Sequence, residues 1–257
     1  GGLAMIRALL FLLGLSAPAQ AQEQIVAGMS QNRVSITADF DGSEILIYGA
    51  VKREAPPPEG QGPLEVIVTV EGPATPVVVR RKDRVAGIWL NNAEVRVSSA
   101  PSFYAVATTG PLDHILSDTD NLRHAITIER VIRAVGITSD ADKAGEFLLG
   151  LLRVRTNEGR YRVLQGKVEL TEETLFRTDV VLPANLTEGE YKVRLFLLRD
   201  KRVIATQDRV IGVRKEGLER WVFNLAQEQP LLYGLISLVL AALAGWGASA
   251  AFRLMRT

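Results

Sequence analysis

Three side chains with catalytic potential lie within five positions of the sequence: Asp113, His114 and Ser117. A carboxylate, an imidazole and a hydroxyl are the groups of a nucleophilic triad. The members of such triads usually converge from separate elements of the fold, so this spacing argues against one. We expect instead that Pro111 opens a helix in which the Asp113 carboxylate lies in the first turn and interacts favourably with the helix dipole.

A second set of polar residues raises the question of a metal site, because Asp118 and Asp120 lie near His114 and His124 in the sequence. Carboxylate and imidazole groups could hold a divalent cation. The favoured alternative is that the aspartates are solvated or cap helices. The chain has no cysteine and only two histidines, which excludes thiolate and multi-histidine sites. We therefore predict no metal and no cofactor.

Composition and motifs exclude several function classes. The chain contains no G-x-S-x-G elbow, P-loop, G-x-G-x-x-G turn or H-E-x-x-H helix. Its 257 residues include 30 basic and 29 acidic side chains, so a broad cationic field for nucleic acid is missing. We predict that the protein is not an enzyme and binds no nucleic acid.

The densest basic cluster consists of Arg80, Arg81, Lys82 and Arg84. Such a cluster could bind an anion or an acidic protein partner. The favoured alternative is a solvated hairpin whose basic side chains protect the edge of a sheet.

Alternating apolar and polar residues predict a body built mainly of strands. The clearest alternations cover 33–40 and 64–70, and shorter β-rich runs cover 77–81, 87–90, 94–97 and 103–108. Asp41-Gly42 provides a tight turn between the first of these and a strand over 44–51. Strands this short and regular favour an immunoglobulin-like antiparallel sandwich.

Aromatic residues and a corner tyrosine accompany these strands. The segments 87–90 and 99–104 each contain aromatic side chains, which we expect in the core rather than in a binding site. Tyr191, which follows Leu186 and Gly189, resembles the corner tyrosine of immunoglobulin-like sandwiches.

The hydrophobic period changes to that of helices after Gly110. Apolar residues at helical spacing predict helices over 128–135 and 144–152, the second preceded by a capping signal at Ser139 and Asp142. Strand patterns return over 173–182, 191–198 and 203–213, with Arg199-Asp200-Lys201 as the turn between the last two. The body therefore divides into a β-sandwich part (22–110), a helical insert (111–165) and a second β part (166–214).

Residues 5–21 have the order of a secretory signal peptide. Arg7 precedes a short apolar run, and Ala19-Gln20-Ala21 offers a cleavage site between small residues. The alternative is an uncleaved anchor, although the run is too short to cross a bilayer core of about 30 Å. We expect cleavage after Ala21 and export of the body.

The C-terminal region predicts a membrane anchor. Residues 215–229 place apolar side chains at helical spacing, as in an amphipathic helix that lies on the membrane or packs on the body. Residues 230–252 carry no charge and form a helix of about 35 Å, long enough to cross a bilayer. Arg253 and Arg256 place the tail, 253–257, in the cytoplasm. We predict a single-pass protein of the inner (cytoplasmic) membrane with its body in the periplasm.

Small residues recur every four positions of the predicted span, at Ala241, Gly245 and Ser249, and therefore lie on one helix face. Such a face lets a second helix approach closely in lipid. The alternative is that alanine and glycine are simply common in membrane helices. A true packing face would contact an integral-membrane permease or a second copy of the chain.

The sequence resembles the uncharacterised alphaproteobacterial family of putative transmembrane proteins, over essentially its whole length. The stretches that carry this resemblance are 36–44, 80–84, 99–110, 182–189, 228–234 and 245–253. The family has no assigned activity, so no catalytic residue is carried over. Its genes often lie beside those for anion permeases of the sulfite exporter type, and the resemblance therefore implies such a partner.

We expect a non-catalytic, membrane-anchored periplasmic accessory protein that assists a membrane partner such as a sulfite-exporter-type anion permease. The alternative is a periplasmic β-sandwich module that binds a ligand or has a structural role in the envelope. Recovery of a permease in stoichiometric amount would distinguish the first function from the second.

Overall fold

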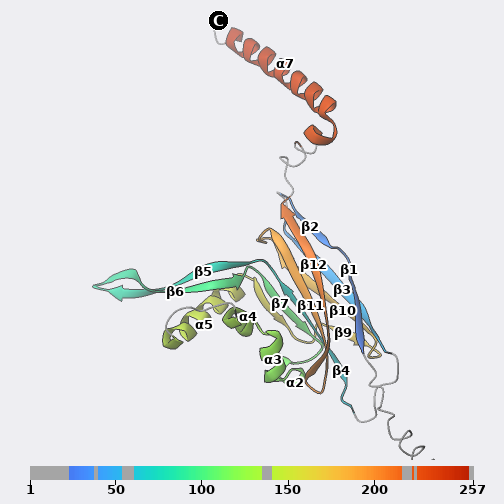
Figure 1. The fold of residues 1–257 in the computed structure, drawn as a ribbon. Coiled ribbons are helices and arrows are strands. Elements are labelled where there is room, and N and C mark those ends of the chain that lie inside the picture. Colours follow the sequence, from blue (N-terminus) through green and yellow to red (C-terminus); the bar gives the residue numbers. More distant parts are fainter. Residues whose placement is uncertain are drawn as a thin grey trace, which may run out of the picture.

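The computed structural model describes residues 23–37, 40–53, 61–134, 141–215, 222 and 225–254 (Figure 1). The predicted signal peptide lies outside these residues, as does much of the predicted amphipathic helix over 215–229. The strands are β1 (Gln24–Met29), β2 (Arg33–Ile36), β3 (Gly42–Lys52), β4 (Leu64–Glu71), β5 (Ala74–Val85), β6 (Ile88–Pro101), β7 (Tyr104–Thr108), β8 (Tyr161–Leu164), β9 (Glu169–Thr171), β10 (Leu175–Pro183), β11 (Gly189–Arg199) and β12 (Arg202–Lys215). The helices are α2 (Leu112–Ile115), α3 (Asp118–His124), α4 (Ile128–Ala134), α5 (Ala141–Asn157) and α7 (Pro230–Leu254).

The strands form two large sheets, which confirms the mainly β architecture. One sheet has the order β1-β3-β10-β9, and the other has the order β2-β12-β11-β4-β7-β8. Pairing is antiparallel except at both edges of the larger sheet, where β2 is parallel to β12 and β8 is parallel to β7. The predicted antiparallel pairing therefore holds within both sheets except at these edges. The helical segment between β7 and β8 supplies the long crossover that a parallel pair requires.

Alternating side chains of the larger sheet enter two separate cores. In β4, Val66 and Val68 pack against the smaller sheet, whereas Ile67 packs against the helices. In β11, Leu197 enters the first core and Phe196 the second. The central strands are thus apolar on both faces, and the body has three layers, with the helical layer on one side of the larger sheet (Figure 1).

Two local features agree with the expected turn chemistry. Asp200 and Lys201 both have positive φ, at 51° and 64°, and form the turn between β11 and β12. The Tyr191 hydroxyl donates a hydrogen bond to the Thr187 carbonyl at 2.9 Å, as a corner tyrosine does. The further immunoglobulin-like detail stays a prediction.

The chain between β2 and β3 does not form the predicted hairpin. β2 ends at Ile36 and belongs to the larger sheet, whereas β3 begins at Gly42 in the smaller sheet. Val34 and Ile45 enter the common core from opposite sheets, so a hairpin within one sheet would remove one of them from this contact. Gly42 has φ +128°, and an added Cβ would lie 2.8 Å from the Leu182 carbonyl oxygen.

The helical insert contains the predicted helices and one that was not predicted. α2 carries Asp113 in its first turn, and α4 and α5 cover most of the two predicted helical segments. α3 was not predicted because its seven residues lack an apolar stripe. It begins where the Ser117 hydroxyl accepts a hydrogen bond from the Asp120 backbone N–H at 3.2 Å.

β5 and β6 form a long two-stranded hairpin, paired with each other and separate from both large sheets. Figure 1 shows that its base lies beside α4 and α5, while its outer half projects away from the body. The sequence predicted these strands as short members of the sandwich, and that placement is wrong.

Candidate binding surface

The basic cluster lies on β5 and is exposed. Arg80 pairs across the hairpin with Glu94 of β6, with 3.2 Å between Nε and Oε2. Arg81 instead reaches α5, where its guanidinium lies 3.0 Å from the Glu146 carboxylate and over the ring of Phe147. A register shift in the β5–β6 pairing between Arg81 and the next residue contributes to this divergence. Arg80 and Arg81 thus have different partners, one across the hairpin and one on α5.

The tip of the hairpin exposes consecutive large apolar side chains. Ala86 and Gly87 both have positive φ, at 49° and 86°, as a two-residue hairpin turn requires. Ile88, Trp89 and Leu90 follow, with 64%, 66% and 50% of their surfaces exposed. The expectation that this aromatic segment lies in the core is therefore wrong.

The second aromatic segment does lie in the core. Phe103 packs between the two large sheets, and Tyr104 packs against the helical layer. Apolar neighbours cover Phe103, which lies just before β7, and Tyr104, the first residue of β7, whereas the tip lies beyond the last packed element. Strand pattern alone does not distinguish these two environments, because both segments combine apolar and aromatic residues.

A groove of about 490 Å³ runs between β5 and α5. Val77, Val78 and Val79 line one side, and Phe147 and Leu151 line the other. Arginines and two glutamates surround these apolar residues: Arg80, Arg81, Arg153, Arg155, Glu146 and Glu158. The groove therefore suits a molecule with an apolar body and an anionic group. The sequence did not reveal it because its two walls are about 70 residues apart.

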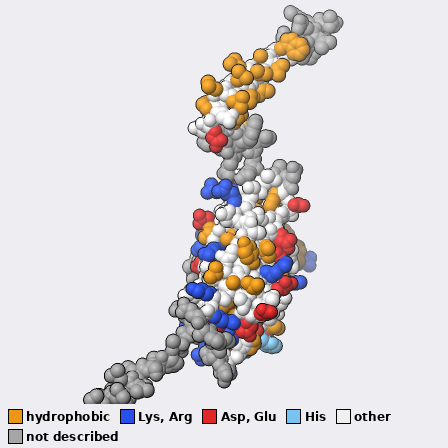
Figure 2. Space-filling view, turned by 90° about the vertical axis from the view of Figure 1, so that its right-hand side faces the viewer, with side chains coloured by type: hydrophobic (Ala, Val, Ile, Leu, Met, Phe, Trp, Pro, Cys, Tyr) orange, Lys and Arg blue, Asp and Glu red, His pale blue; other side chains and the backbone are white. Residues whose placement is uncertain are grey.

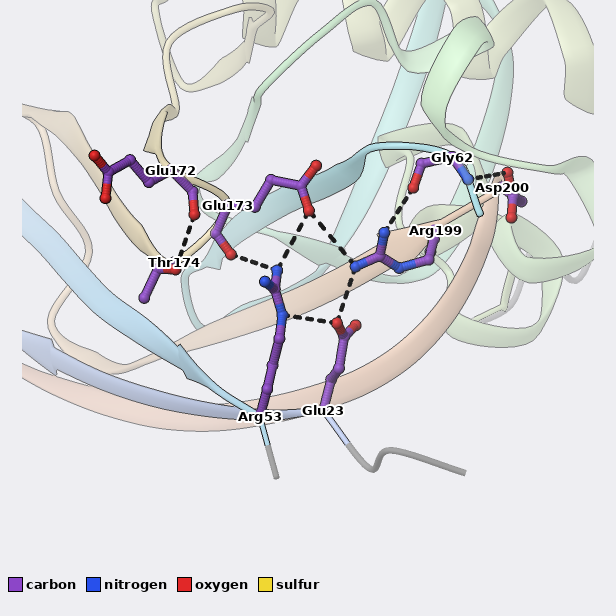
Figure 3. A network of polar contacts seen from close by, with 8 residues as sticks. All are labelled: Glu23, Arg53, Gly62, Glu172, Glu173, Thr174, Arg199 and Asp200. Carbon is purple, nitrogen blue, oxygen red and sulfur yellow. Dashed lines mark hydrogen bonds and ion pairs between the residues drawn. The ribbon is translucent and has the colours of Figure 1, made fainter. Parts of the chain in front are cut away.

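Buried ionic groups join several segments at one end of the sandwich (Figure 3). Arg199 donates to the Glu23 carboxylate at 2.9 Å and to the Gly62 carbonyl at 2.6 Å. Arg53 donates to the same Glu23 oxygen at 2.9 Å and to the Glu173 carbonyl at 2.5 Å. These charges are paired with one another, so we assign this network to fold stability rather than to ligand binding.

The residues considered for a triad are not arranged as one. Asp113 and His114 are exposed, with 3.6 Å between Asp113 Oδ2 and His114 Nε2. The Ser117 hydroxyl contacts Asp120, where it caps α3. Asp113 thus lies in the first turn of a helix, as the helix interpretation predicts.

The residues considered for a metal site also have other contacts. The Asp120 carboxylate accepts hydrogen bonds from Arg123 and from the Val203 backbone N–H. The His124 ring packs edge-on against Phe196, with 5.7 Å between centroids. Among the described residues, no three His, Asp or Glu side chains come together as a metal site would need.

Tyr104 is a buried polar group of the helical layer. Its hydroxyl donates to the Ile126 carbonyl at 2.7 Å and accepts from Arg194 at 3.3 Å. Arg194 also donates to the carbonyls of His124 and Ala125 at the end of α3. Burial raises the pKa of Tyr104 to about 12, although the neighbouring Arg194 opposes this effect. The hydroxyl is therefore protonated at neutral pH and serves as a hydrogen-bond donor.

α7 has the properties of a membrane span. Residues Pro230–Ala248 have a mean hydropathy of 1.9, and none of this segment is buried within the chain. Figure 2 shows apolar side chains along α7, whereas the visible face of the body mixes both signs of charge. Ala241 and Gly245 lie on this exposed helix, and a Cβ added to Gly245 would meet no atom within 4 Å. Ser249 lies in the same helix, but its side chain is outside the described set.

A mainly β body followed by one apolar helix of membrane-spanning length defines a membrane-anchored protein. The chain belongs to the family described as "Putative transmembrane protein" (Alph_Pro_TM), whose model matches residues 24–254. This match confirms the resemblance inferred from the sequence. No curated protein matches the chain.

Proposed function

We propose that the protein is a non-catalytic, membrane-anchored periplasmic accessory protein that assists an integral-membrane partner such as a sulfite-exporter-type anion permease. The observation that carries this proposal is the contrast between the body and α7. In the body, apolar side chains on both faces of the larger sheet are buried in two cores. The 19-residue span Pro230–Ala248 buries nothing against that body, so its surface is available to lipid and to another membrane protein.

The face of α7 that carries Ala241 and Gly245 is the proposed contact with the partner helix. Small side chains allow the close backbone approach by which helices gain packing energy in lipid. Gly247 provides a matched control, because a residue two positions along a helix lies about 200° around its axis. A Cβ added to either glycine would meet no atom of this chain within 4 Å, so neither substitution clashes internally.

The test is copurification of the tagged full chain in mild detergent, followed by mass spectrometry of the membrane proteins recovered. We expect a permease in stoichiometric amount with the unmodified chain and with Gly247→Leu. We expect at least a tenfold loss with Gly245→Leu, because the leucine side chain separates the two helices. Equal recovery with both variants would refute the helix-mediated contact, and absence of any permease would refute the accessory function.

The groove between β5 and α5 favours a second candidate function, a periplasmic module that binds a ligand. Its apolar walls and arginine rim suit an anionic amphiphile. The anionic dye 1-anilinonaphthalene-8-sulfonate is a suitable probe. Dye fluorescence that is lost on Val154→Trp, which places a large ring in the groove, would support this function. Equal fluorescence in Leu175→Trp, at an exposed residue of β10, would show that the added ring itself is not the cause.

A further inference from the structure

We propose that the tip of the β5–β6 hairpin, Ile88, Trp89 and Leu90, inserts into the headgroup region of an anionic lipid bilayer. This contact would be a second attachment of the body to the membrane, besides α7. It goes beyond the accessory function and does not require a protein partner.

The shape of the hairpin makes such an insertion possible. β5 has 12 residues, and at about 3.3 Å per residue the hairpin is about 40 Å long. Its inner half packs beside α4 and α5, and its outer half extends beyond every other element of the body (Figure 1). The tip can therefore reach a surface that the sheets and helices do not touch.

The apolar character of the tip favours lipid over a flat protein surface. Successive residues of a strand point to opposite faces, so Ile88 and Leu90 project from one face and Trp89 from the other. All three are at least half exposed. A protein surface would cover one face and leave the other in water, whereas lipid surrounds both. Tryptophan in particular prefers the membrane interface.

The charge of the hairpin complements an anionic membrane. Residues 74–101 contain five basic and two acidic side chains, whereas the rest of the chain contains 25 basic and 27 acidic ones. Arg84 lies opposite Trp89 in the strand register, and Lys82 lies opposite Asn91. Both cations thus lie at the level of the apolar tip or about 7 Å behind it, where lipid phosphates would be found after insertion.

The anchor makes a weak contact of this kind effective. α7 keeps the body near lipid at all times, so the tip binds at a high effective concentration. Fourteen residues, 216–229, separate Lys215 at the end of β12 from Pro230 at the start of α7, and 225–228 among them are helical.

The absence of cysteine from the sequence permits a direct test in the full chain. Leu90→Cys introduces a single thiol, which is labelled with the environment-sensitive fluorophore NBD. Val163→Cys, at an exposed apolar residue of β8, is the matched control. Both proteins are reconstituted into vesicles of phosphatidylethanolamine and phosphatidylglycerol, with or without brominated lipid as a quencher. Vesicles of phosphatidylcholine alone provide the uncharged comparison.

We expect at least a twofold gain in NBD fluorescence at position 90 in anionic vesicles relative to detergent, and quenching by brominated lipid. The signal should fall severalfold with Lys82→Glu and Arg84→Glu combined, and in phosphatidylcholine, while position 163 stays unchanged. A water-exposed and unquenched probe at position 90 would overturn the proposal. A gain in NBD fluorescence at position 90 that requires a protein partner and is not quenched by brominated lipid would assign the tip to a protein contact. That result would also overturn the proposal. These results do not depend on recovery of a permease, so the two proposals can fail separately.

Discussion

At the level of single residues, the network around Arg199 shows how a buried charge is accommodated. The Arg199 side chain is 6% exposed and that of Glu23 is 8% exposed, so both charges have lost most of their hydration. Arg53 and the Gly62 carbonyl supply further partners. The network joins the segment just before β1 to the ends of β3 and β11, and therefore fixes segments that are distant in sequence.

Removal of Arg199 should destabilise the fold strongly. Arg199→Ala leaves the buried Glu23 carboxylate with fewer partners, and breaking a buried pair in this way costs about 3–5 kcal/mol of unfolding free energy. Arg96→Ala is the matched control, because Arg96 forms an exposed pair with Glu94 at 3.8 Å and should contribute less than about 1 kcal/mol. Chemical denaturation followed by circular dichroism measures both. Equal stability of the two variants would contradict a structural role for the network.

The buried tyrosines predict a loss of stability at alkaline pH. Burial raises the pKa of Tyr104 and of Tyr161 from 10.0 to about 12. The unfolded chain releases these protons near pH 10 while the folded chain retains them, so stability is full below pH 10 and decreases between pH 10 and about 12. Tyr104→Phe should reduce this decrease, at a constant cost of about 1 kcal/mol for the lost hydrogen bond. Thermal melts from pH 8 to 12 test this, with the exposed Tyr48→Phe as the control. An unchanged pH dependence in Tyr104→Phe would show that the raised pKa of Tyr104 does not cause the alkaline loss of stability.

At the level of elements, glycines mark where strands approach too closely for a side chain. A Cβ at Gly49 of β3 would lie 2.6 Å from the Val26 carbonyl oxygen and 2.9 Å from Ala27 Cα, both of which belong to the backbone of β1. At Gly145 of α5, by contrast, no atom lies within 4 Å of an added Cβ. The same substitution should therefore have opposite effects in the two elements.

Gly49→Ala should lower the unfolding free energy by about 2 kcal/mol or more, because the β1–β3 pairing must shift to admit the methyl group. Gly145→Ala should raise it by about 0.5–1 kcal/mol, since alanine has the higher helix propensity. Thermal melts of the two variants measured side by side give the comparison. A stabilising Gly49→Ala would show that β1 and β3 are not paired as described.

The sequence predicted the positions of strands and helices better than it predicted which strands pair with one another. Strand and helix positions follow from hydrophobic period, and β10, β11 and β12 lie close to where that period places them. Sheet membership depends on contacts between distant segments. The sequence pattern therefore could not predict that β2 and β3 belong to different sheets or that the edge strands are parallel. The hairpin tip could have been recognised from one signal: Ala86-Gly87 is a turn, and three consecutive large apolar residues follow it without alternation.

In the binding surface, too, local sequence features could be predicted, whereas contacts between distant segments could not. The basic residues of β5 were found because they are clustered in sequence. The groove was not found, because Val78 and Phe147 belong to different elements that meet only in the folded chain. The exposure of Trp89 depends on how far the hairpin projects, which its own sequence does not specify.

At the level of the whole molecule, the remaining question is on which side of the membrane the body lies. Arg253 and Arg256 follow the uncharged span directly, and positive residues close to a span are retained in the cytoplasm. The signal-like order of residues 5–21 independently predicts export of the body. Both signals predict the same orientation, with the body in the periplasm.

Single thiols can test this orientation in spheroplasts, because the sequence itself contains none. Val163→Cys lies on an exposed residue of the body and should react with a membrane-impermeant maleimide in intact spheroplasts. Thr257→Cys, four residues beyond Arg253, should react only after lysis, since moving the tail arginines across the bilayer is unfavourable. Arg253→Glu combined with Arg256→Glu weakens the retention signal and should increase labelling at position 257 in intact spheroplasts. Labelling at position 257 but not at 163 in unlysed spheroplasts would reverse the topology and place the hairpin, the groove and the body in the cytoplasm.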